Sequence, residues 1–559
     1  MKSGQDTTDS SENPKLKLGL VLVKSELRAW NYSIIEKILS EGHGEISFVL
    51  FVNEDFKTTS RVATLRNVIS DSIEKLDEFL FRRWCELDAL SECRYEDLQL
   101  AIPEITATPM KCPDNTCFSD SIVDEVKKLN LDVLVNLSSA TYTGNIYQAA
   151  THGIWSLDSG DESKLSLNQK IFWQFFLKKT ETCNLLEKSE SATEPRMIID
   201  ASWSAVQSIS PTVNKHHVLW NLAALVPRQV RRLRINGSAS FHHEARQHST
   251  SLACRAESSF HKPNSVIAIF LYLLSLIATM KAVFRERYFW IQWQIGFSLG
   301  SGIETNLVRY QPLAVPDDES WADPWIIERD EKFYIFFERM KKSSSRGTLS
   351  VIEMDAAGQN SAPRSVMEKN YHLSYPSLIE ANGTLYMLPE TRENRTIELH
   401  ECLEFPGRWV FKMNLMRDIE AVDTTLYFHL GKWWMFSVLV SGKGRDSCED
   451  LHLFFCKDLL SDNWVSHPLN PIVSDVRVAR SAGGVFEHDG KLIRPSQDCS
   501  KRYGFSINFN EIVELSETTY SEKSISRIMP ELNSSILGTH TFNRSKGISV
   551  IDFYRSKRI

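Results

Sequence analysis

The chain of 559 residues is too long for a single hydrophobic core and predicts two or three domains. Its composition, 42% hydrophobic and 24% charged, is typical of a soluble protein, and its net charge of -7 provides no basic excess for neutralising phosphates. Nucleic acid is therefore excluded as a partner. The ten cysteines contain no CxxC pair, which favours reduced thiols in a cytoplasmic protein and predicts no metal site; Cys112 and Cys117 are expected to be loop thiols.

The first residues, 1–14, are polar and lack the apolar core of a signal peptide, so we expect a disordered tail. An apolar run from Leu16 to Lys24, a helical segment from Trp30 to Ser40 and a second run from Ile46 to Asn53 then predict a β-α-β unit. A further buried strand is expected from Leu131 to Leu137. This alternation favours a parallel α/β sheet over residues 15–235, and because no GxGxxG follows its first strand, a dinucleotide site is excluded.

This α/β region resembles the N-terminal domain of the formyltransferase superfamily, in its opening strand and helix and in the segment LDVLVNLSSATYTGNIYQAATHGIWSLDSGD. The resemblance implies transfer of a formyl group to an amine, with 10-formyltetrahydrofolate as the donor. Active members carry an Asn-x-His pair where this chain has Ser156 and Asp158, so the site is atypical. His152 is a candidate substitute for the missing histidine, and Asp161 is expected to close a turn.

The segment 163–188 is expected to be an amphipathic helix. Residues 236–288 are predicted to be a linker followed by an apolar helix, because Ser265–Met280 holds sixteen residues without a charge, just short of the roughly twenty that span a bilayer. Three arrangements stay open for this helix: buried between domains, lying on a membrane surface through 265–287, or spanning the membrane. The protein is thus predicted to be cytoplasmic with a potential for membrane association.

Four hairpin-like segments follow at intervals of roughly 50 residues, the length of one propeller blade. They are Trp321–Glu338, Tyr375–Glu390, Asp423–Val438 and Ala482–Asp498, each with two apolar runs around a polar turn. Gly383, Gly431 and Gly490 occupy turn positions that require a positive φ, whereas Glu331 makes the first copy irregular. The segment from Trp290 is expected to close the ring. Residues 289–559 are therefore predicted to form a five-bladed β-propeller.

This second half resembles the propeller domain of plant glucosamine inositolphosphorylceramide transferases, which is itself similar to glycoside hydrolase family 43. The resemblance is carried by WADPW, YHLSYPSLIEANGTLYMLPET, HPLNPIVSDVRVARSAGG and RPSQDCSKRYGFSINFNEI. The domain order is similar to that of bacterial two-domain proteins. In family 43 an Asp of an Asp-Pro pair is the general base and a second Asp tunes its pKa, which implies these roles for Asp323 and Asp423. Glu390, Glu338 and Asp498 are candidates for the third carboxylate, but none matches the family's motif for the acid.

Polar residues at the heads of the inner strands are expected to converge on the propeller axis, where carboxylates, amides and an arginine suit sugar hydroxyls. The resemblance of the two halves to glycan-modifying proteins implies a protein of glycan or glycolipid biosynthesis that modifies an amino sugar and holds a carbohydrate or glycolipid acceptor in its propeller. The alternatives are a non-catalytic carbohydrate-binding scaffold and a glycoside hydrolase. The predicted substrate-binding residues are Asp323, Tyr375, Glu390, Asp423, Arg480, Gln497, Asp498, Tyr503, Asn508 and Asn510.

Overall fold

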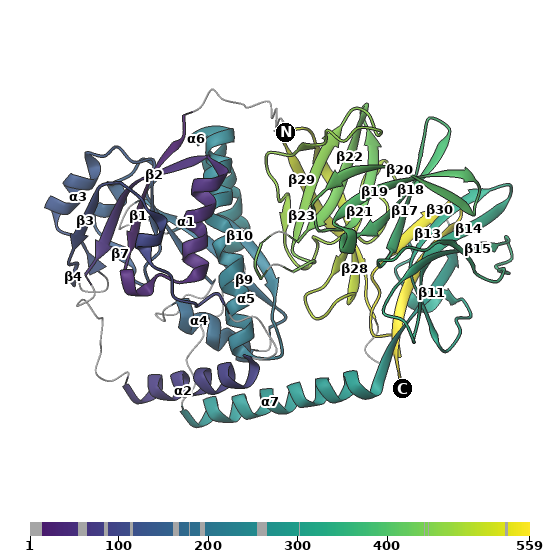
Figure 1. The fold of residues 1–559 in the computed structure, drawn as a ribbon, viewed down its shortest axis with the longest axis horizontal. Helices are drawn as coiled ribbons and strands as arrows, with labels where there is room; N and C mark the ends of the chain where they lie inside the picture. Colours follow the sequence, from purple (N-terminus) through teal and green to yellow (C-terminus); the bar gives the residue numbers. More distant parts are fainter. Residues whose placement is uncertain are drawn as a thin grey trace. The chain divides into compact units, whose positions relative to one another are not determined.

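The computed structural model describes residues 14–53, 64–82, 88–111, 116–159, 167–177, 179–190, 196–253, 265–300, 302–440, 442–444, 446–530 and 535–558. The predicted tail, except for Pro14, and the predictions for Cys112 and Asp161 lie outside these residues. The chain divides into two compact units, Met1–Lys281 and Ala282–Ile559 (Figure 1).

The first unit is built on a seven-stranded sheet with the order β10-β9-β8-β6-β1-β2-β3. The strands from β8 to β3 are parallel, but β9 pairs antiparallel with both β8 and β10. The sheet is therefore mixed, and the prediction of a purely parallel sheet is wrong at this edge. The strands are β1 (Leu16–Leu22), β2 (Gly44–Val52), β3 (Glu104–Ala107), β6 (Val133–Asn136), β8 (Ile154–Asp158), β9 (Glu181–Ser189) and β10 (Met197–Ala205), and a small sheet holds β4 (Met110–Lys111), β5 (Thr116–Cys117) and β7 (Tyr142–Thr143).

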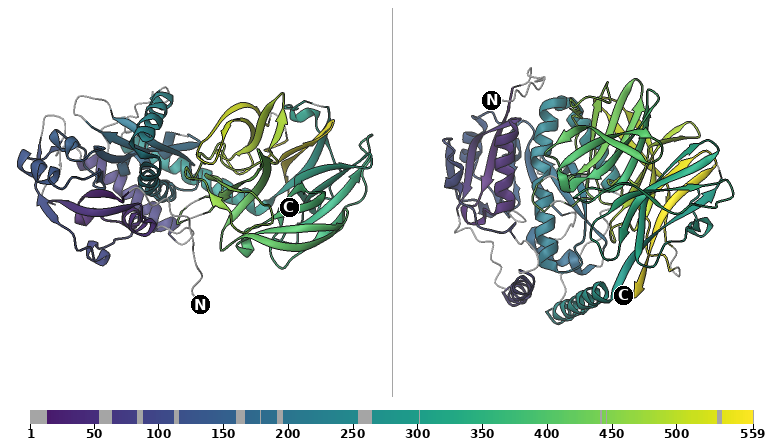
Figure 2. Two further views of the ribbon diagram at one scale, coloured as in Figure 1. Left: turned by 90° about the horizontal axis from the view of Figure 1, so that it is seen from above. Right: turned by 45° about the vertical axis from the view of Figure 1, so that its right-hand side comes forward.

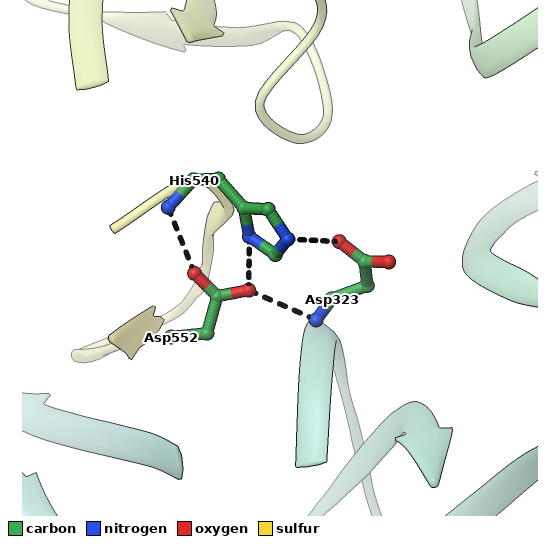
Figure 3. Close-up of side chains that lie close together, drawn as sticks. All are labelled: Asp323, His540 and Asp552. Carbon is green, nitrogen blue, oxygen red and sulfur yellow. Dashed lines mark hydrogen bonds and ion pairs between the residues drawn. The ribbon is translucent and has the colours of Figure 1, made fainter. Parts of the chain in front are cut away.

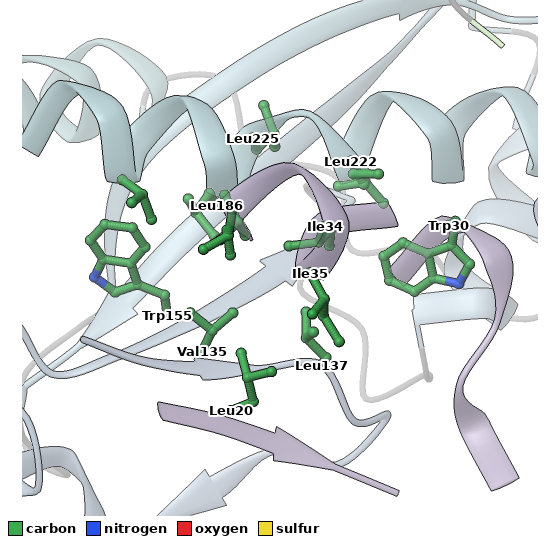
Figure 4. Close-up of a cluster of buried hydrophobic side chains, with 14 of the residues drawn as sticks. Leu20, Trp30, Ile34, Ile35, Val135, Leu137, Trp155, Leu186, Leu222 and Leu225 are labelled. Atoms are coloured by element: carbon green, nitrogen blue, oxygen red, sulfur yellow. The ribbon is translucent and has the colours of Figure 1, made fainter. Parts of the chain in front are cut away.

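Helices cover both faces of this sheet because its strands are apolar on both sides. One core joins Leu20 of β1 and Val135 of β6 to helices α1, α5 and α6, and Figure 4 shows Ile34, Leu222 and other side chains of this cluster. Helix α3 packs on the other face through Val123 and Val126. The helices are α1 (Ala29–Glu41), α2 (Thr64–Phe81), α3 (Asp120–Lys127), α4 (Leu167–Gln174), α5 (Pro211–Ala223), α6 (Leu225–Ala253) and α7 (Ser265–Tyr288).

Two expectations for this unit are corrected. The predicted helix over 163–188 is helical only as α4, and its second half forms the strand β9. The predicted linker at the start of 236–288 is helical as far as Ala253, as the end of α6, whereas the apolar helix predicted after it is confirmed as α7. Cys117 is disulfide-bonded, so the prediction of reduced thiols is wrong there, while Cys402, Cys448, Cys456 and Cys499 are free.

The second unit is a five-bladed β-propeller, as predicted, and its five sheets are seen from two further directions in Figure 2. Four blades follow the chain order outward from the axis, and the fifth combines strands from both ends of the unit. The strands are β11 (Phe289–Leu299), β12 (Gln311–Pro312), β13 (Glu319–Arg329), β14 (Lys332–Lys341), β15 (Thr348–Met354), β16 (Arg364–Met367), β17 (Ser374–Ala381), β18 (Thr384–Thr391), β19 (Thr396–Glu404), β20 (Arg408–Arg417), β21 (Ala421–His429), β22 (Lys432–Leu439), β23 (Asp450–Cys456), β24 (Val465–Ser466), β25 (Val473–Ser474), β26 (Phe486–His488), β27 (Lys491–Asp498), β28 (Ser506–Leu515), β29 (Tyr520–Ile528), β30 (Phe542–Ser545) and β31 (Ile548–Arg558).

The ring closes through β11, which pairs antiparallel with β31 along its whole length, from Phe289 opposite Arg558 to Leu299 opposite Ile548. The first strand of the unit thus completes the last blade, as the sequence predicted. Closure leaves no long unpaired edge between the first and the last blade, which removes a site for edge-to-edge association.

The four predicted hairpins are β13–β14, β17–β18, β21–β22 and β26–β27. Gly383, Gly431 and Gly490 have φ values of 75, 77 and 72°, as predicted for two-residue turns. In the first hairpin Glu331 itself takes a φ of 60°, so this copy is regular rather than irregular. A side chain in this left-handed region costs about 1–2 kcal/mol relative to the right-handed one, and the surrounding hairpin holds it there.

Candidate functional site

The inner strands of three consecutive blades each contain a β-bulge at the same place. The register shifts lie between Ala322 and Trp325 in β13, between Ser374 and Ser377 in β17, and between Val422 and Thr425 in β21. Within them Asp323, Tyr375 and Asp423 have φ values of 54, 43 and 48°. Left-handed backbone at non-glycine residues is a form of strain that clusters at functional sites, and bulges re-aim side chains.

Gly483 takes the corresponding place in the fourth blade. Its φ is 132°, and a Cβ there would lie 1.9 Å from the carbonyl oxygen of Phe542, so only glycine fits. Its N–H donates to the Tyr375 hydroxyl at 2.9 Å, and that hydroxyl also lies 2.8 Å from Thr425 Oγ1. Tyr375 therefore joins three blades around the axis.

Asp323 connects the first blade to both of its neighbours. Its carboxylate accepts from the Tyr375 N–H at 3.2 Å and from Thr541 Oγ1 at 2.7 Å, and its own N–H donates to Asp552 at 2.9 Å. The side chain is 5% exposed. The predicted convergence of strand heads is therefore confirmed for Asp323 and Tyr375.

A histidine lies between two of these carboxylates (Figure 3). His540 Nδ1 is 2.6 Å from Asp552 and its Nε2 is 3.7 Å from Asp323, while its ring stacks on Trp293 at 3.8 Å. Burial alone would lower the pKa of His540, but the carboxylates of Asp552 and Asp323 raise it to about 9. His540 is thus an imidazolium at neutral pH. The three side chains also lie close enough together to share a metal ion, because each offers a ligand atom within 4.8 Å of the other two.

A second ion pair lies beside it. Arg480 Nε donates to Asp423 at 2.6 Å, Gln497 Nε2 donates to the same oxygen at 2.9 Å, and all three side chains are buried. The Arg480 guanidinium also lies 4.8 Å above the ring of Tyr503, which is 47% exposed. Asp423, Arg480, Gln497 and Tyr503 are therefore brought together as predicted.

Two glutamates on the second strands of their blades complete the cluster. Burial, followed by the nearby Asp423 carboxylate, raises the pKa of Glu390 to about 8, and burial with Asp323 raises the pKa of Glu338 well above its usual value. Burial also raises the pKa of Asp323 to about 6. The axial site therefore holds carboxyl protons at neutral pH and can both donate and accept hydrogen bonds.

Glu390 also lines a surface pocket of about 440 Å³. The other lining residues are charged or titratable: His372, Arg392, Glu393, Arg395 and Glu420. The Gly347 N–H donates to His372 Nδ1, so His372 carries its proton on Nε2, which lies 3.3 Å from Glu338. This pocket therefore connects the surface of the propeller to the axial carboxyls.

Three predicted binding residues make hydrogen bonds within the fourth blade. Asp498 accepts from the Ser500 N–H and caps a turn, while Asn508 donates to the Arg477 carbonyl. Asn510 donates to the Arg494 carbonyl and to Ser496. These bonds hold the fourth blade together and account for the burial of these polar groups.

The predicted site in the first unit is a cleft of about 350 Å³ at the carboxyl ends of β6 and β8. Here the strand order reverses between β1 and β6, which is where open α/β sheets bind ligands. Ser156 and Asp158 line this cleft, as do Asn136, Lys170 and Arg196. His152 precedes β8 at its opposite end and packs on Phe241, so the structure places it away from the cleft.

Asp158 is paired rather than free. Lys170 donates to both carboxylate oxygens of Asp158, at 2.8 and 3.0 Å. The Asp158 side chain is 17% exposed and the Lys170 side chain is 10% exposed. Asn136 donates to the Ala140 carbonyl and accepts from Ser138. The Asp158 carboxylate and the Asn136 amide are therefore already bonded within the protein.

Comparison with known proteins concerns mainly the propeller. Residues 314–548 match the family profile described as "Glucosamine inositolphosphorylceramide transferase 1, N-terminal". The Arabidopsis thaliana protein of that name is 29% identical over 207 residues, and the rice (Oryza sativa subsp. japonica) protein over 204 residues; each match covers 36% of this chain and 27% of the relative. The chain thus spans about a quarter of these transferases, and the predicted resemblance of the propeller to them is confirmed.

Among solved structures, a family 117 glycoside hydrolase from Zobellia galactanivorans is 11% identical, with a TM-score of 0.32, over 47% of this chain and 90% of its own.

Sequence reasoning did not place Asp552 and His372 in the site, and it offered Glu338 only as a possible third carboxylate. His540, through Asp323 and Asp552, ties the last blade to the first. Asp552 lies in the closing strand and belongs to no motif. It is 229 residues away from Asp323 in the sequence, and the closure of the ring brings the two residues together. The signal for Glu338 was its place at the end of a hairpin that begins with Asp323.

Proposed function

We propose that this protein takes part in glycolipid biosynthesis and that the axial site of its propeller holds the sugar headgroup of a glycolipid acceptor. The similarity of residues 314–548 to transferases named for glucosamine and inositolphosphorylceramide supports this proposal. The matched segment includes Asp323, Tyr375, Asp423, Arg480 and His540.

The observation that carries the proposal is the pocket of about 440 Å³ in which the buried Glu390 meets several charged side chains, and burial raises the pKa of Glu390 so that it holds a proton. A sugar hydroxyl donates one hydrogen bond and accepts others, so a site that recognises it needs both kinds of partner. Glu390, with a pKa of about 8, donates at neutral pH, while its neighbours Arg392 and Glu393 in the same pocket add a donor and an acceptor. Such convergent polar groups in a concave site are typical of ligand binding.

Binding is favoured over glycoside hydrolysis because no residue of this sequence matches the general acid of family 43. Hydrolysis of a glycosidic bond needs a carboxylic acid and a second carboxylate on the two sides of the bond. Asp423 is held by Arg480 and Gln497, and Asp323 accepts bonds from Thr541 and the Tyr375 N–H. We therefore propose recognition of the sugar without cleavage.

The test is calorimetry of the full chain with glucosamine, with inositol phosphate and with a headgroup that combines them. We expect binding near neutral pH that weakens as the pH rises through about 8, because Glu390 then loses its donor proton. Glu390→Gln, which keeps a donor at every pH, should bind with no such dependence, and Glu390→Ala should bind poorly. The exposed Glu380 provides the matched control Glu380→Gln. An absence of heat with all three compounds, or full binding by Glu390→Ala, would refute the proposal.

The expected one-carbon donor does not fit the cleft of the first unit. Asp158 is neutralised by Lys170, Ser156 supplies no imidazole or amide, and no histidine is among the described residues that line the cleft. We therefore derive no formyl-transfer step and expect no heat from 10-formyltetrahydrofolate in the same calorimeter. Heat together with a formylated amino sugar would restore that activity.

A further inference from the structure

Helix α7 exposes an apolar face along most of its length. Ten large apolar side chains between 266 and 284 are at least 42% exposed, and none of the residues from 266 to 280 is charged. The helix is long and apolar enough to cross a membrane. The ten are Val266, Ile267, Ile269, Phe270, Leu273, Leu274, Ile277, Met280, Val283 and Phe284. A helix surface that faces water ordinarily carries polar side chains, whereas this exposed face of α7 is apolar.

The opposite face of α7 is fixed to the first unit. Ala268 and Tyr272 are 2% and 3% exposed and pack with Ile73 of α2. Two turns of helix further along, Thr279 Oγ1 donates to the Ile209 carbonyl at 2.7 Å. These contacts recur at spacings of four and seven residues, so one side of the helix lies lengthwise against the domain.

A buried carboxylate fastens this arrangement. Asp77 of α2 is 0% exposed and accepts from the Tyr272 hydroxyl at 2.9 Å, from the Thr212 N–H at 3.0 Å and from Ser210 Oγ at the start of α5. Detaching α7 would leave this carboxylate without one of its donors, which costs free energy in a buried setting.

Helix α2 lies beside α7, as Figure 1 shows, and adds to the same apolar surface. Its Leu76, Phe79 and Leu80 are 49%, 79% and 43% exposed. The exposed apolar surface is therefore formed by two neighbouring helices rather than by one.

We propose that the α2–α7 surface binds a lipid bilayer with both helices in the plane of the membrane. The contacts of Ala268, Tyr272 and Thr279 hold α7 lengthwise on the domain, which is incompatible with crossing the bilayer. Lys281, Arg285 and Arg287 follow the apolar stretch on the same helix, against a single Glu286, and place net positive charge where anionic headgroups would lie. Anionic lipid is thus the occupant that the charges favour.

Flotation of the full chain with vesicles tests this. Vesicles of phosphatidylcholine with phosphatidylglycerol should carry the protein upward, and vesicles of phosphatidylcholine alone should carry less. The triple substitution Phe270→Ser, Leu273→Gln, Ile277→Gln should lower the bound fraction at least about tenfold, since apolar burial drives insertion at the interface. Phe79→Ser should lower it less. Leu403→Gln and Leu430→Gln, on exposed propeller residues, are the matched controls and should bind like the wild type.

Three outcomes would overturn the proposal. The wild type could fail to float with either vesicle, or the triple variant, with an unchanged melting curve, could float equally well. Bound wild type could also resist an alkaline carbonate wash, which would indicate a spanning helix. If the wild type instead ignores vesicles and forms a dimer that the triple variant lacks, a second copy of the chain covers this surface.

Discussion

Replacing His540 with glutamine should remove a pH-dependent part of the propeller's stability. The pKa of His540 is about 9 in the folded protein, against about 6.5 for an unperturbed histidine. At about 1.36 kcal/mol per pKa unit, charging this imidazole stabilises the fold by about 3 kcal/mol. Because the pKa is raised by folding, this contribution is complete below about pH 6.5 and is lost as the pH rises through about 9.

Urea unfolding, followed by hydrogen exchange of peptides from the propeller, would measure this. The free energy of unfolding of the wild type minus that of His540→Gln should be about 3 kcal/mol larger below about pH 6 than above about pH 9.5. His488, which is 26% exposed and lies 3.6 Å from Asp489, supplies the control His488→Gln, for which little difference is expected. A gap between wild type and His540→Gln that stays constant with pH would refute the imidazolium between Asp323 and Asp552.

Two further predictions concern stability. Glu331→Gly should stabilise the first hairpin by about 1 kcal/mol in thermal unfolding, because glycine adopts a φ of 60° without the steric cost of a Cβ. The control Glu331→Ala keeps the Cβ and should give no such gain. Equal effects of the two substitutions would show that strain at this turn is absent. Lys170→Met should destabilise the first unit by about 3 kcal/mol in urea, since it leaves the Asp158 carboxylate largely buried without its cation, whereas Lys170→Arg should lose less; an unaffected Lys170→Met would mean that water already screens the pair.

The propeller could be predicted because the sequence signals for each hairpin lie within that hairpin. Each hairpin carries its own turn residues and its own apolar alternation, so Gly383 and Gly431 mark turns whatever the rest of the chain does. The heads of the inner strands follow from the same repeats, which is why Asp323, Tyr375 and Asp423 were found together. Their left-handed φ values could not be predicted, because none of the three residues is a glycine.

Features that depend on distant residues escaped prediction. Strand β9 has the composition of a helix, and only pairing with β8 and β10 makes it a strand. The Lys170–Asp158 pair was missed because α4 had to be docked under the sheet before its lysine could reach the cleft. The apolar character of α7 was plain in the sequence, but its docking through Tyr272 and Asp77 required the fold.

One feature is common to both units. Asp158, Asp323 and Asp423 align with catalytic positions of the enzyme families that the chain resembles, and each has a cation beside it. Asp158 has Lys170 at 2.8 Å, Asp423 has Arg480 at 2.6 Å, and Asp323 has His540 at 3.7 Å. Removing one partner of a buried pair costs about 3–5 kcal/mol, so these cations are needed for the fold whatever the site binds. Burial raises the pKa of Asp323 to about 6 and that of Glu390 to about 8, so both groups can exchange a proton near neutral pH. Of these two, Glu390 lines the surface pocket, and the proposed recognition of a sugar headgroup therefore depends on Glu390.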